Sequence, residues 1–272
     1  MALSVQVRLQ RIEKRLAKSR DDGRLVYADP LFFARHSLGF TPDSWQEQVL
    51  SWTGHRLLLN CCRQSGKSVT AAVLALHYAL HWPRSLILLV SPSLRQSSEL
   101  FKKLKAFLNV LPVRPALNED NRLSLEMANG SRVVSLPATE ARIRGFSGAD
   151  LIVEDESARV PDELYLACRP MLAVSNGRLI LMSTPWGTRG HFFEAWENGG
   201  PSWARVCVTA AGCPRISPEF LAEERRTMPR AWYDSEYNCL FTDTVDSIFS
   251  SADIAAALSP DVQPLFPTEV LH

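Results

Sequence analysis

The residues Gly66-Lys67-Ser68 have the chemistry of a phosphate-binding loop. Such a loop holds nucleotide phosphates with backbone N–H groups at the start of a helix. Glycine permits close backbone approach, lysine adds an ammonium group, and serine offers a hydroxyl to Mg²⁺. The usual pattern begins with a glycine where this sequence has Cys61, and a small side chain suffices there if φ stays negative. We therefore predict that the loop binds nucleotide through Cys62, Arg63, Gln64, Ser65, Gly66, Lys67 and Ser68.

The segments on either side of this loop support the prediction. An apolar run, Leu57 to Leu59, precedes it, and an Ala- and Leu-rich helical pattern, Val69 to Leu80, follows it. Strand, loop and helix in this order are the expected setting of a phosphate-binding loop. The alternative at this point is an ordinary strand-turn-helix unit with no ligand.

A second candidate motif is the apolar run Leu151 to Val153 followed by Glu154-Asp155-Glu156. A buried strand that ends in two acids suits nucleotide hydrolysis: Asp155 would hold Mg²⁺ and Glu156 would orient and deprotonate the attacking water. Glu154 falls one residue earlier along the strand and is therefore expected on its opposite side. The alternative is a strand with a charged end.

Two further segments carry polar groups close to these motifs. Gln46 lies about twenty residues before Lys67, and its amide could pair with the edge of adenine, although an ordinary helix with a core Trp45 is an equal alternative. Ser183 and Thr184 follow an apolar strand, 177–182, where hydroxyl groups could link the γ-phosphate region to a moving loop. Because Pro185 follows, a simple strand-exit turn is the alternative.

The composition describes a chain that can form a large α/β domain. It has 272 residues and a net charge of +1, so any nucleic-acid surface must be local. The six cysteines show no metal-ligand spacing and are read as reduced thiols, and the apolar runs are too short to cross a membrane.

Periodicity and turn residues predict the remaining elements. We expect strands at 85–90 and 203–209, a hairpin over 122–136, a basic helix over 94–108, and helices that begin near Ser217 and Pro229. Residues 4–20 have the pattern of an amphipathic basic helix that packs on the domain or docks on a neighbour or DNA.

Together the motifs resemble the ATPase domain of the large terminase subunit, the DNA-packaging motor of tailed bacteriophages and related prophages. The resemblance covers roughly residues 40–245, and Arg63-Gln64 before Gly-Lys, in a loop without its first glycine, is its most specific part. The other matching segments are Trp45-Gln46, Ile143 to Ser147, Leu151 to Glu156, Leu181 to Pro185 and Trp232 to Phe241.

The resemblance implies roles for individual residues. Gln46 would read adenine, and Arg63 would sense the γ-phosphate within the same chain. Arg144 would be an arginine finger presented to the ATP of the next subunit in a ring. The sequence leaves open whether Arg63, Arg142 or Arg144 supplies this charge. The resemblance also implies that Lys67 and Ser68 hold the phosphates and Mg²⁺, and that Asp155 completes the metal site. Glu156 would be the catalytic carboxylate. Ser183 and Thr184 would couple hydrolysis to movement.

The predicted fold is an α/β, RecA-type P-loop ATPase with a mainly parallel sheet flanked by helices and a small C-terminal helical subdomain. The expected divisions are an N-terminal helical extension, the ATPase core, a helical lid, and a linker toward a nuclease domain absent from this chain. They span residues 1–40, 41–212, 213–250 and 251–272.

The function that the resemblance implies is Mg²⁺-dependent ATP hydrolysis that moves double-stranded viral DNA into a procapsid in the host cytoplasm. Its partners would be the portal protein and the small terminase subunit, with a homo-oligomeric ring on the portal and a monomer in isolation. We expect no DNA cleavage by this chain, since few acids follow Phe241. The alternatives are a single motor domain of a helicase-like translocase and a nucleotide-binding scaffold without turnover.

Overall fold

A computed structural model describes residues 29–138, 145–242 and 256–257. Eight strands form one sheet in the order β3-β4-β5-β2-β6-β7-β1-β8. The bounds are β1 Arg56–Cys61, β2 Leu86–Ser91, β3 Leu117–Asp120, β4 Ser124–Met127, β5 Arg132–Pro137, β6 Leu151–Asp155, β7 Arg178–Ser183 and β8 Ala204–Val208. Neighbouring strands pair in parallel along the part of the sheet that runs β5-β2-β6-β7-β1-β8. The pairs β3-β4 and β4-β5 are antiparallel. The predicted, mainly parallel α/β sheet is thereby confirmed.

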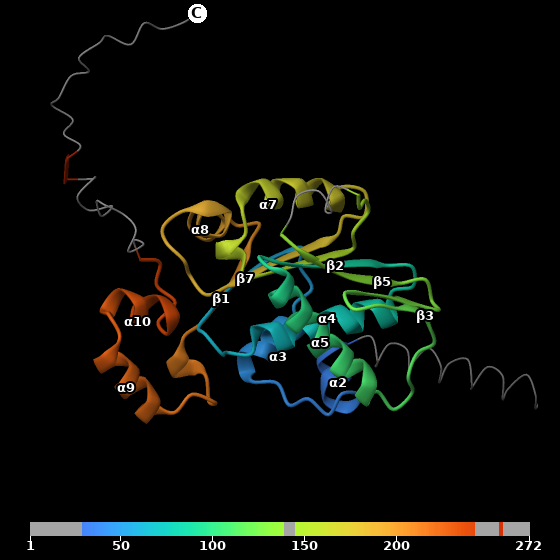
Figure 1. The fold of residues 1–272 in the computed structure, drawn as a ribbon, viewed down its shortest axis with the longest axis horizontal. Coiled ribbons are helices and arrows are strands. Elements are labelled where there is room, and N and C mark those ends of the chain that lie inside the picture. Colours follow the sequence, from blue (N-terminus) through green and yellow to red (C-terminus); the bar gives the residue numbers. More distant parts are fainter. Residues whose placement is uncertain (1–28, 139–144, 243–255, 258–272) are drawn as a thin grey trace, which may run out of the picture.

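Helices cover both faces of this sheet (Figure 1). One face carries α2, α3, α4 and α5, and the other carries α7 and α8 (Figure 1). Their bounds are α2 Pro30–His36, α3 Ser44–Leu50, α4 Lys67–His81, α5 Leu94–Val110, α7 Asp162–Cys168 and α8 Gly190–Asn198. Short 3₁₀ turns are η1 Ser157–Arg159, η2 Arg169–Leu172 and η3 Ala210–Gly212. None of the helices in the described part of the chain is long and apolar enough to cross a membrane.

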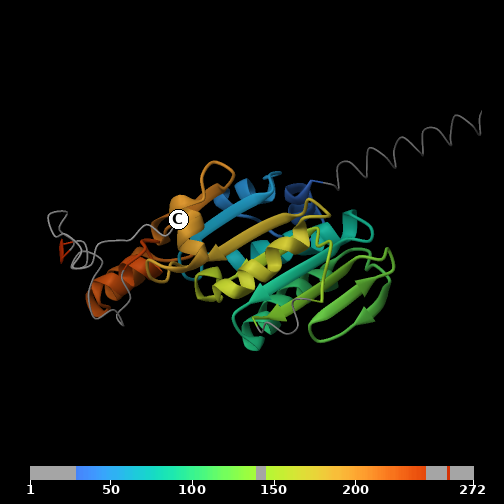
Figure 2. The ribbon, with the colours of Figure 1, turned by 90° about the horizontal axis from the view of Figure 1, so that it is seen from above.

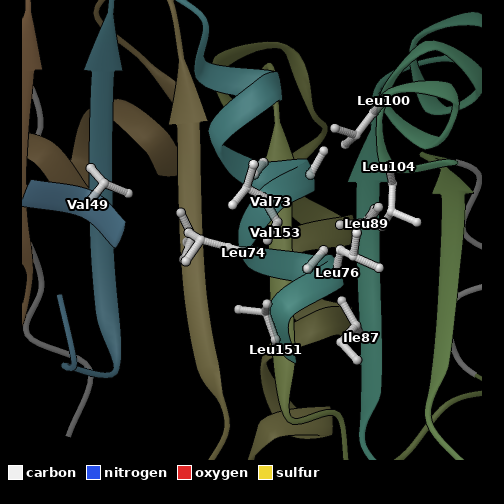
Figure 3. Close-up of a cluster of buried hydrophobic side chains, with 14 of the residues drawn as sticks. Val49, Val73, Leu74, Leu76, Ile87, Leu89, Leu100, Leu104, Leu151 and Val153 are labelled. Atoms are coloured by element: carbon white, nitrogen blue, oxygen red, sulfur yellow. The ribbon is translucent and has the colours of Figure 1, made fainter. Parts of the chain in front are cut away.

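The core consists of two apolar layers, one on each face of the sheet. On the α4 side, apolar residues of α4 and α5 pack on β2 and β6, as Figure 3 shows. The second layer lies between the opposite face and the α7 and α8 side. Strand β6 serves both layers, because Leu151 and Val153 face α4 while Ile152 faces the other side.

Two further helices, α9 Pro218–Thr227 and α10 Arg230–Glu236, lie near the carboxyl ends of β1 and β8 (Figures 1 and 2). Tyr233 and Tyr237 join Cys62, Cys213 and Cys239 in a small third apolar cluster. Helices are thus present where the sequence predicted a C-terminal helical subdomain, and their apolar cluster reaches the predicted phosphate-binding loop through Cys62.

Most of the predicted elements are confirmed within two residues of their expected bounds. The helix capped by Ser93 is α5, where the Ser93 hydroxyl accepts a hydrogen bond from the Gln96 amide at 3.3 Å. Helices α2, α7 and α8 and strand β3 were not predicted from the sequence. The predicted helix over residues 4–20 lies outside the described residues, and the proposed domain boundaries remain predictions.

Candidate functional site

The loop between β1 and α4 holds the first group of side chains that the sequence predicted to be functional. Cys61 is fully buried as the last residue of β1 and does not have a positive φ, which explains why glycine is unnecessary there. Gly66 has φ +98, a conformation that favours glycine. A Cβ at Gly66 would also lie 2.9 Å from Gln46 Nε2, so a larger residue here would be strained and would displace the end of the Gln46 side chain.

The two predicted motifs meet at the carboxyl ends of β1 and β6. Lys67 Nζ lies 2.9 Å from Glu156 Oε1, and Ser68 Oγ donates a hydrogen bond to Asp155 Oδ2 at 3.0 Å. Lys67 also donates to Thr184 Oγ1 at 3.4 Å, from the end of β7. Four predicted residues and one residue of the expected coupling pair therefore form one contact network. Ser183 is buried beside Thr184, and its hydroxyl donates to the Thr184 carbonyl at 2.7 Å.

Burial and charge set the electrostatics of this network. Burial alone would lower the pKa of Lys67, but the negative charges of Glu156 and Asp155 raise it above its ordinary value. Burial, together with the neighbouring Glu156 carboxylate, raises the pKa of Asp155 to about 6. A cation or phosphate group that enters the site would change the pKa values of both Lys67 and Asp155, and such sensitivity is typical of a binding site.

The donor set at this position fits a magnesium ion. Ser68 offers a hydroxyl oxygen and Asp155 a carboxylate oxygen, and Mg²⁺ prefers one or two such ligands together with phosphate oxygens and water. The described residues contain no cluster of three or more His, Cys, Asp or Glu side chains that could hold a metal alone. The residues therefore fit a metal that shares its ligands with a nucleotide.

Glu156 stands in an unusual backbone conformation. Its φ of 54 and ψ of 43 place it in the left-handed region, which non-glycine residues seldom adopt. Its amide donates to Asp155 Oδ1 at 3.0 Å, and its carbonyl accepts from the Arg159 amide at 2.9 Å. This turn directs the Glu156 carboxylate toward Lys67.

Glu154 lies on the other side of β6, as strand alternation predicts. It is fully buried, and its Oε1 lies 2.5 Å from both Ser157 Oγ and His191 Nε2. It has no contact with Lys67 or Ser68, which confirms the prediction that it lies on the side of the strand opposite Asp155. No sequence pattern indicated His191 as its partner.

Gln46 is buried directly beneath the phosphate-binding loop. Its Oε1 accepts from the Asp43 amide at 2.9 Å, and its Nε2 donates to Thr70 Oγ1 at 3.0 Å. Both ends of its amide are thus engaged within the protein and connect the start of α3 to α4. The role of Gln46 in reading adenine remains a prediction.

The candidate arginines occupy different positions. Arg63 is largely exposed, and its Nη1 lies 3.7 Å from Glu236 Oε2 on α10. Arg142 and Arg144 lie outside the described residues, so the arginine-finger prediction remains open.

Sequence reasoning missed Arg215, which connects the C-terminal subdomain to the loop. Its Nη1 lies 2.6 Å from Asp43 Oδ2, and its Nη2 donates to the Ser65 carbonyl. A hollow of about 320 Å³ opens beside these groups and is lined in part by Arg63, Gln64, Arg215, Phe220 and Tyr237. Arg215 stands in a connecting segment without periodicity, so no sequence signal marks it.

The chain is similar to proteins of one known family. Residues 58–256 match the family model described as terminase large subunit, T4likevirus-type, N-terminal. Over 257 residues the chain is 25% identical to the terminase large subunit of Thermus virus P23-45, a match that covers 81% of this chain and 53% of that protein. The chain thus spans about half the length of this relative.

Solved structures of large terminases share the fold. The large terminase ATPase domain of Thermus phage P74-26 is 22% identical, with a TM-score of 0.66, over 78% of this chain and 97% of that one. The large terminase of a thermophilic bacteriophage, solved in complex with ATP-γ-S, is 13% identical, with a TM-score of 0.60, over 73% of this chain and 52% of that one. The family model covers well over half of the chain, and the chain therefore belongs to the terminase large subunit family, which it matches in the family's N-terminal part.

Proposed function

We propose that this chain hydrolyses ATP as the motor domain of a DNA-packaging terminase. The observation that carries the proposal is the convergence of Lys67, Ser68, Asp155 and Glu156 at the ends of β1 and β6. These are the groups that phosphoryl transfer to water requires: a cation for phosphate, ligands for a metal, and a base for the nucleophile. A structurally similar large terminase that binds ATP-γ-S supports the choice of nucleotide.

Each residue would act through a simple physical step. The β- and γ-phosphates would replace Glu156 as the partner of Lys67, because an ammonium group prefers the higher negative charge. Glu156, released from Lys67, would accept a proton from the attacking water. Ser68 and Asp155 would hold Mg²⁺, which supplies charge neutralisation at the phosphates when bound.

The nucleoside end of ATP would lie in the hollow between the loop and the C-terminal subdomain. Phe220 and Tyr237 offer aromatic surface there, and Arg63 and Arg215 offer donors. The alternative, in which Gln46 reads adenine, requires the amide of Gln46 to release its hydrogen bonds with Asp43 and Thr70. Arg63 or Arg144 would supply the additional positive charge of the transition state, Arg144 from a neighbouring subunit.

Thr184 provides a route from ATP to movement. Its hydroxyl contacts Lys67, and the carbonyl of the next residue, Pro185, accepts a hydrogen bond from Ser235 of α10 at 2.7 Å. A change at the γ-phosphate would therefore pass from Lys67 through Thr184 and Pro185 to the C-terminal subdomain. We propose that this motion drives double-stranded DNA, with portal protein and small terminase subunit as partners, in a ring that assembles in the host cytoplasm.

Steady-state ATP hydrolysis with Mg²⁺ tests the enzymatic part of this proposal. Glu156→Gln should lower kcat by about 10²- to 10⁴-fold because the base is lost. ATP should bind this variant at least as tightly, since Lys67 loses its competing partner. Lys67→Ala should lose nucleotide binding itself. Glu119→Gln, an exposed acid on β3 at the opposite edge of the sheet, is the matched control and should behave as wild type.

Equal turnover by wild type and Glu156→Gln, at every protein concentration and with DNA present, would reduce the proposal to nucleotide binding. Unwinding of duplex DNA by the wild-type chain would favour the helicase-like alternative.

A further inference from the structure

A buried polar cluster lies on the side of β6 that faces away from the phosphate-binding loop. His191, at the start of α8, lies between two acids: Nε2 is 2.5 Å from Glu154 Oε1, and Nδ1 is 2.9 Å from Asp162 Oδ1. Ser157 Oγ lies 3.0 Å from Nε2 and donates to the same oxygen of Glu154. The ring of Tyr165 stacks on the imidazole at 4.4 Å between centroids.

Serine, histidine and aspartate in this order resemble a hydrolytic triad, but burial excludes that chemistry. Ser157 is fully buried, and its hydroxyl donates to Glu154. A nucleophile must be presented to substrate and must share its proton with the base alone. The cluster is therefore not a second reaction centre.

Stability does not account for the cluster either. Glu154 is fully buried, and its Oε2 has no hydrogen-bond partner among the described residues. Replacing buried ionisable clusters by well-packed apolar side chains of similar volume is often neutral or stabilising, so such a cluster is weak evidence of a role in stability. What such a cluster offers is a fixed geometry, because each short hydrogen bond restricts the orientation of its partner.

The residues fixed in this way flank the proposed metal ligand and base. Glu154 directly precedes Asp155-Glu156, and Ser157 directly follows this pair. Both are tied to the same imidazole, so His191 holds the two ends of the turn in which Glu156 takes its left-handed conformation. A left-handed non-glycine residue persists only where its surroundings impose it.

We propose that His191 is a positioning residue for Glu156, which it orients toward the γ-phosphate through Glu154 and Ser157. The inference rests on the proposed ATP hydrolysis and adds to it a residue from α8, a helix that contributes nothing to the Lys67 network. Misplacement of a catalytic group by about 1 Å can cost about 10²-fold in rate. Loss of the Nε2 contacts should therefore appear in kcat rather than in nucleotide affinity.

A pair of substitutions separates the two ring nitrogens. In His191→Gln the amide can reach the position of Nε2 and still donate to Glu154, whereas in His191→Asn it reaches only the position of Nδ1, beside Asp162. We expect His191→Asn to lower kcat by about 10²-fold, with KM and ATP affinity within about threefold of wild type. His191→Gln should recover at least tenfold of this loss.

Tyr165→Leu is the control for packing, because it removes the stacked ring and leaves the hydrogen bonds intact. It should lower the unfolding temperature while kcat stays at the wild-type value. Equal kcat in His191→Asn and wild type would overturn the proposal, as would equal losses in the Asn and Gln variants.

Hydrogen exchange of the backbone over residues 154–159 gives a readout that does not depend on turnover. Exchange should accelerate in His191→Asn and remain near wild type in His191→Gln. If wild type shows no ATPase activity, the proposed function fails, and unchanged exchange in His191→Asn would separately overturn the positioning role.

Discussion

At the level of single residues, the key feature of the site is the small number of groups that contact the Lys67 ammonium. Its ammonium contacts Glu156 and Thr184, which come from the ends of two different strands. Because Lys67 is only 7% exposed, these contacts decide what the ammonium can bind. The loop that carries Lys67 depends in turn on Gly66, because its positive φ disfavours any residue with a side chain.

Gly66→Ala should weaken ATP binding at least tenfold and lower the free energy of unfolding by about 1–3 kcal/mol, the cost of a left-handed non-glycine residue. The new methyl group would also meet Gln46 Nε2 at 2.9 Å. Urea unfolding and calorimetric titration with ATP measure the two effects. Gly212→Ala is the matched control, since it has a negative φ and no atom within 4 Å of the new Cβ. Wild-type affinity in Gly66→Ala would show that the loop does not bind phosphate in this conformation.

At the level of secondary-structure elements, the two faces of β6 carry acidic residues with different contacts. Asp155 faces α4 and the phosphate-binding loop, while Glu154 faces α8. The α7 and α8 helices are joined across this face by Asp162, which accepts hydrogen bonds from the His191 amide at 2.8 Å and from its ring. Burial alone would lower the pKa of His191, but the bonds and charges of Glu154 and Asp162 raise it above its ordinary value.

This raised pKa predicts how stability depends on pH. The folded state binds the His191 proton more tightly than the unfolded state, so the contribution is complete below about pH 6.5, the ordinary pKa of histidine. It is lost as the pH rises through the higher pKa of the folded state. The difference in unfolding free energy between wild type and His191→Gln should therefore shrink from pH 6 toward pH 9, as urea unfolding at each pH would show.

His55→Gln, in which an exposed ring is replaced, is the control and should give a curve parallel to wild type. A constant difference between wild type and His191→Gln over this range would contradict a proton held by the cluster.

At the scale of the whole molecule, the C-terminal helices complete the site. Arg215 contacts Asp43 and the loop, the Arg63 amide donates to the Glu236 carbonyl at 2.9 Å, and Ser235 contacts Pro185. The proposed nucleotide would thus contact both the sheet and the α9 and α10 helices. The small net charge of +1 gives no long-range attraction to DNA, so the isolated chain should bind duplex DNA weakly.

A nucleotide that spans both parts should stabilise them together. A non-hydrolysable ATP analogue at about 100 times its Kd should raise the free energy of unfolding by about 2.7 kcal/mol. It should also slow hydrogen exchange in residues 213–237. Lys67→Ala should lose both effects, and Glu119→Gln should keep them. Protection confined to the sheet would place the nucleoside outside the hollow lined by Phe220 and Tyr237.

The local units of this protein follow from contiguous stretches of its sequence. The strand, loop and helix around Lys67 and the acidic end of β6 could be predicted because their residues are contiguous. Their apolar runs, turn residues and strand alternation are local properties. The same local reasoning placed Glu154 on the face opposite Asp155. It gave no prediction for α7 and α8, short helices of seven and nine residues whose patterns span few turns.

Which of these units meet depends on how the chain folds in three dimensions. Thr184 reaches Lys67 across 117 positions of sequence, Arg215 reaches Ser65 across 150, and His191 reaches Glu154 across 37. Such contacts follow from the order of strands in the sheet and from the face that each helix covers. Periodicity does not encode either, because it reports which side of an element is buried and not what covers it.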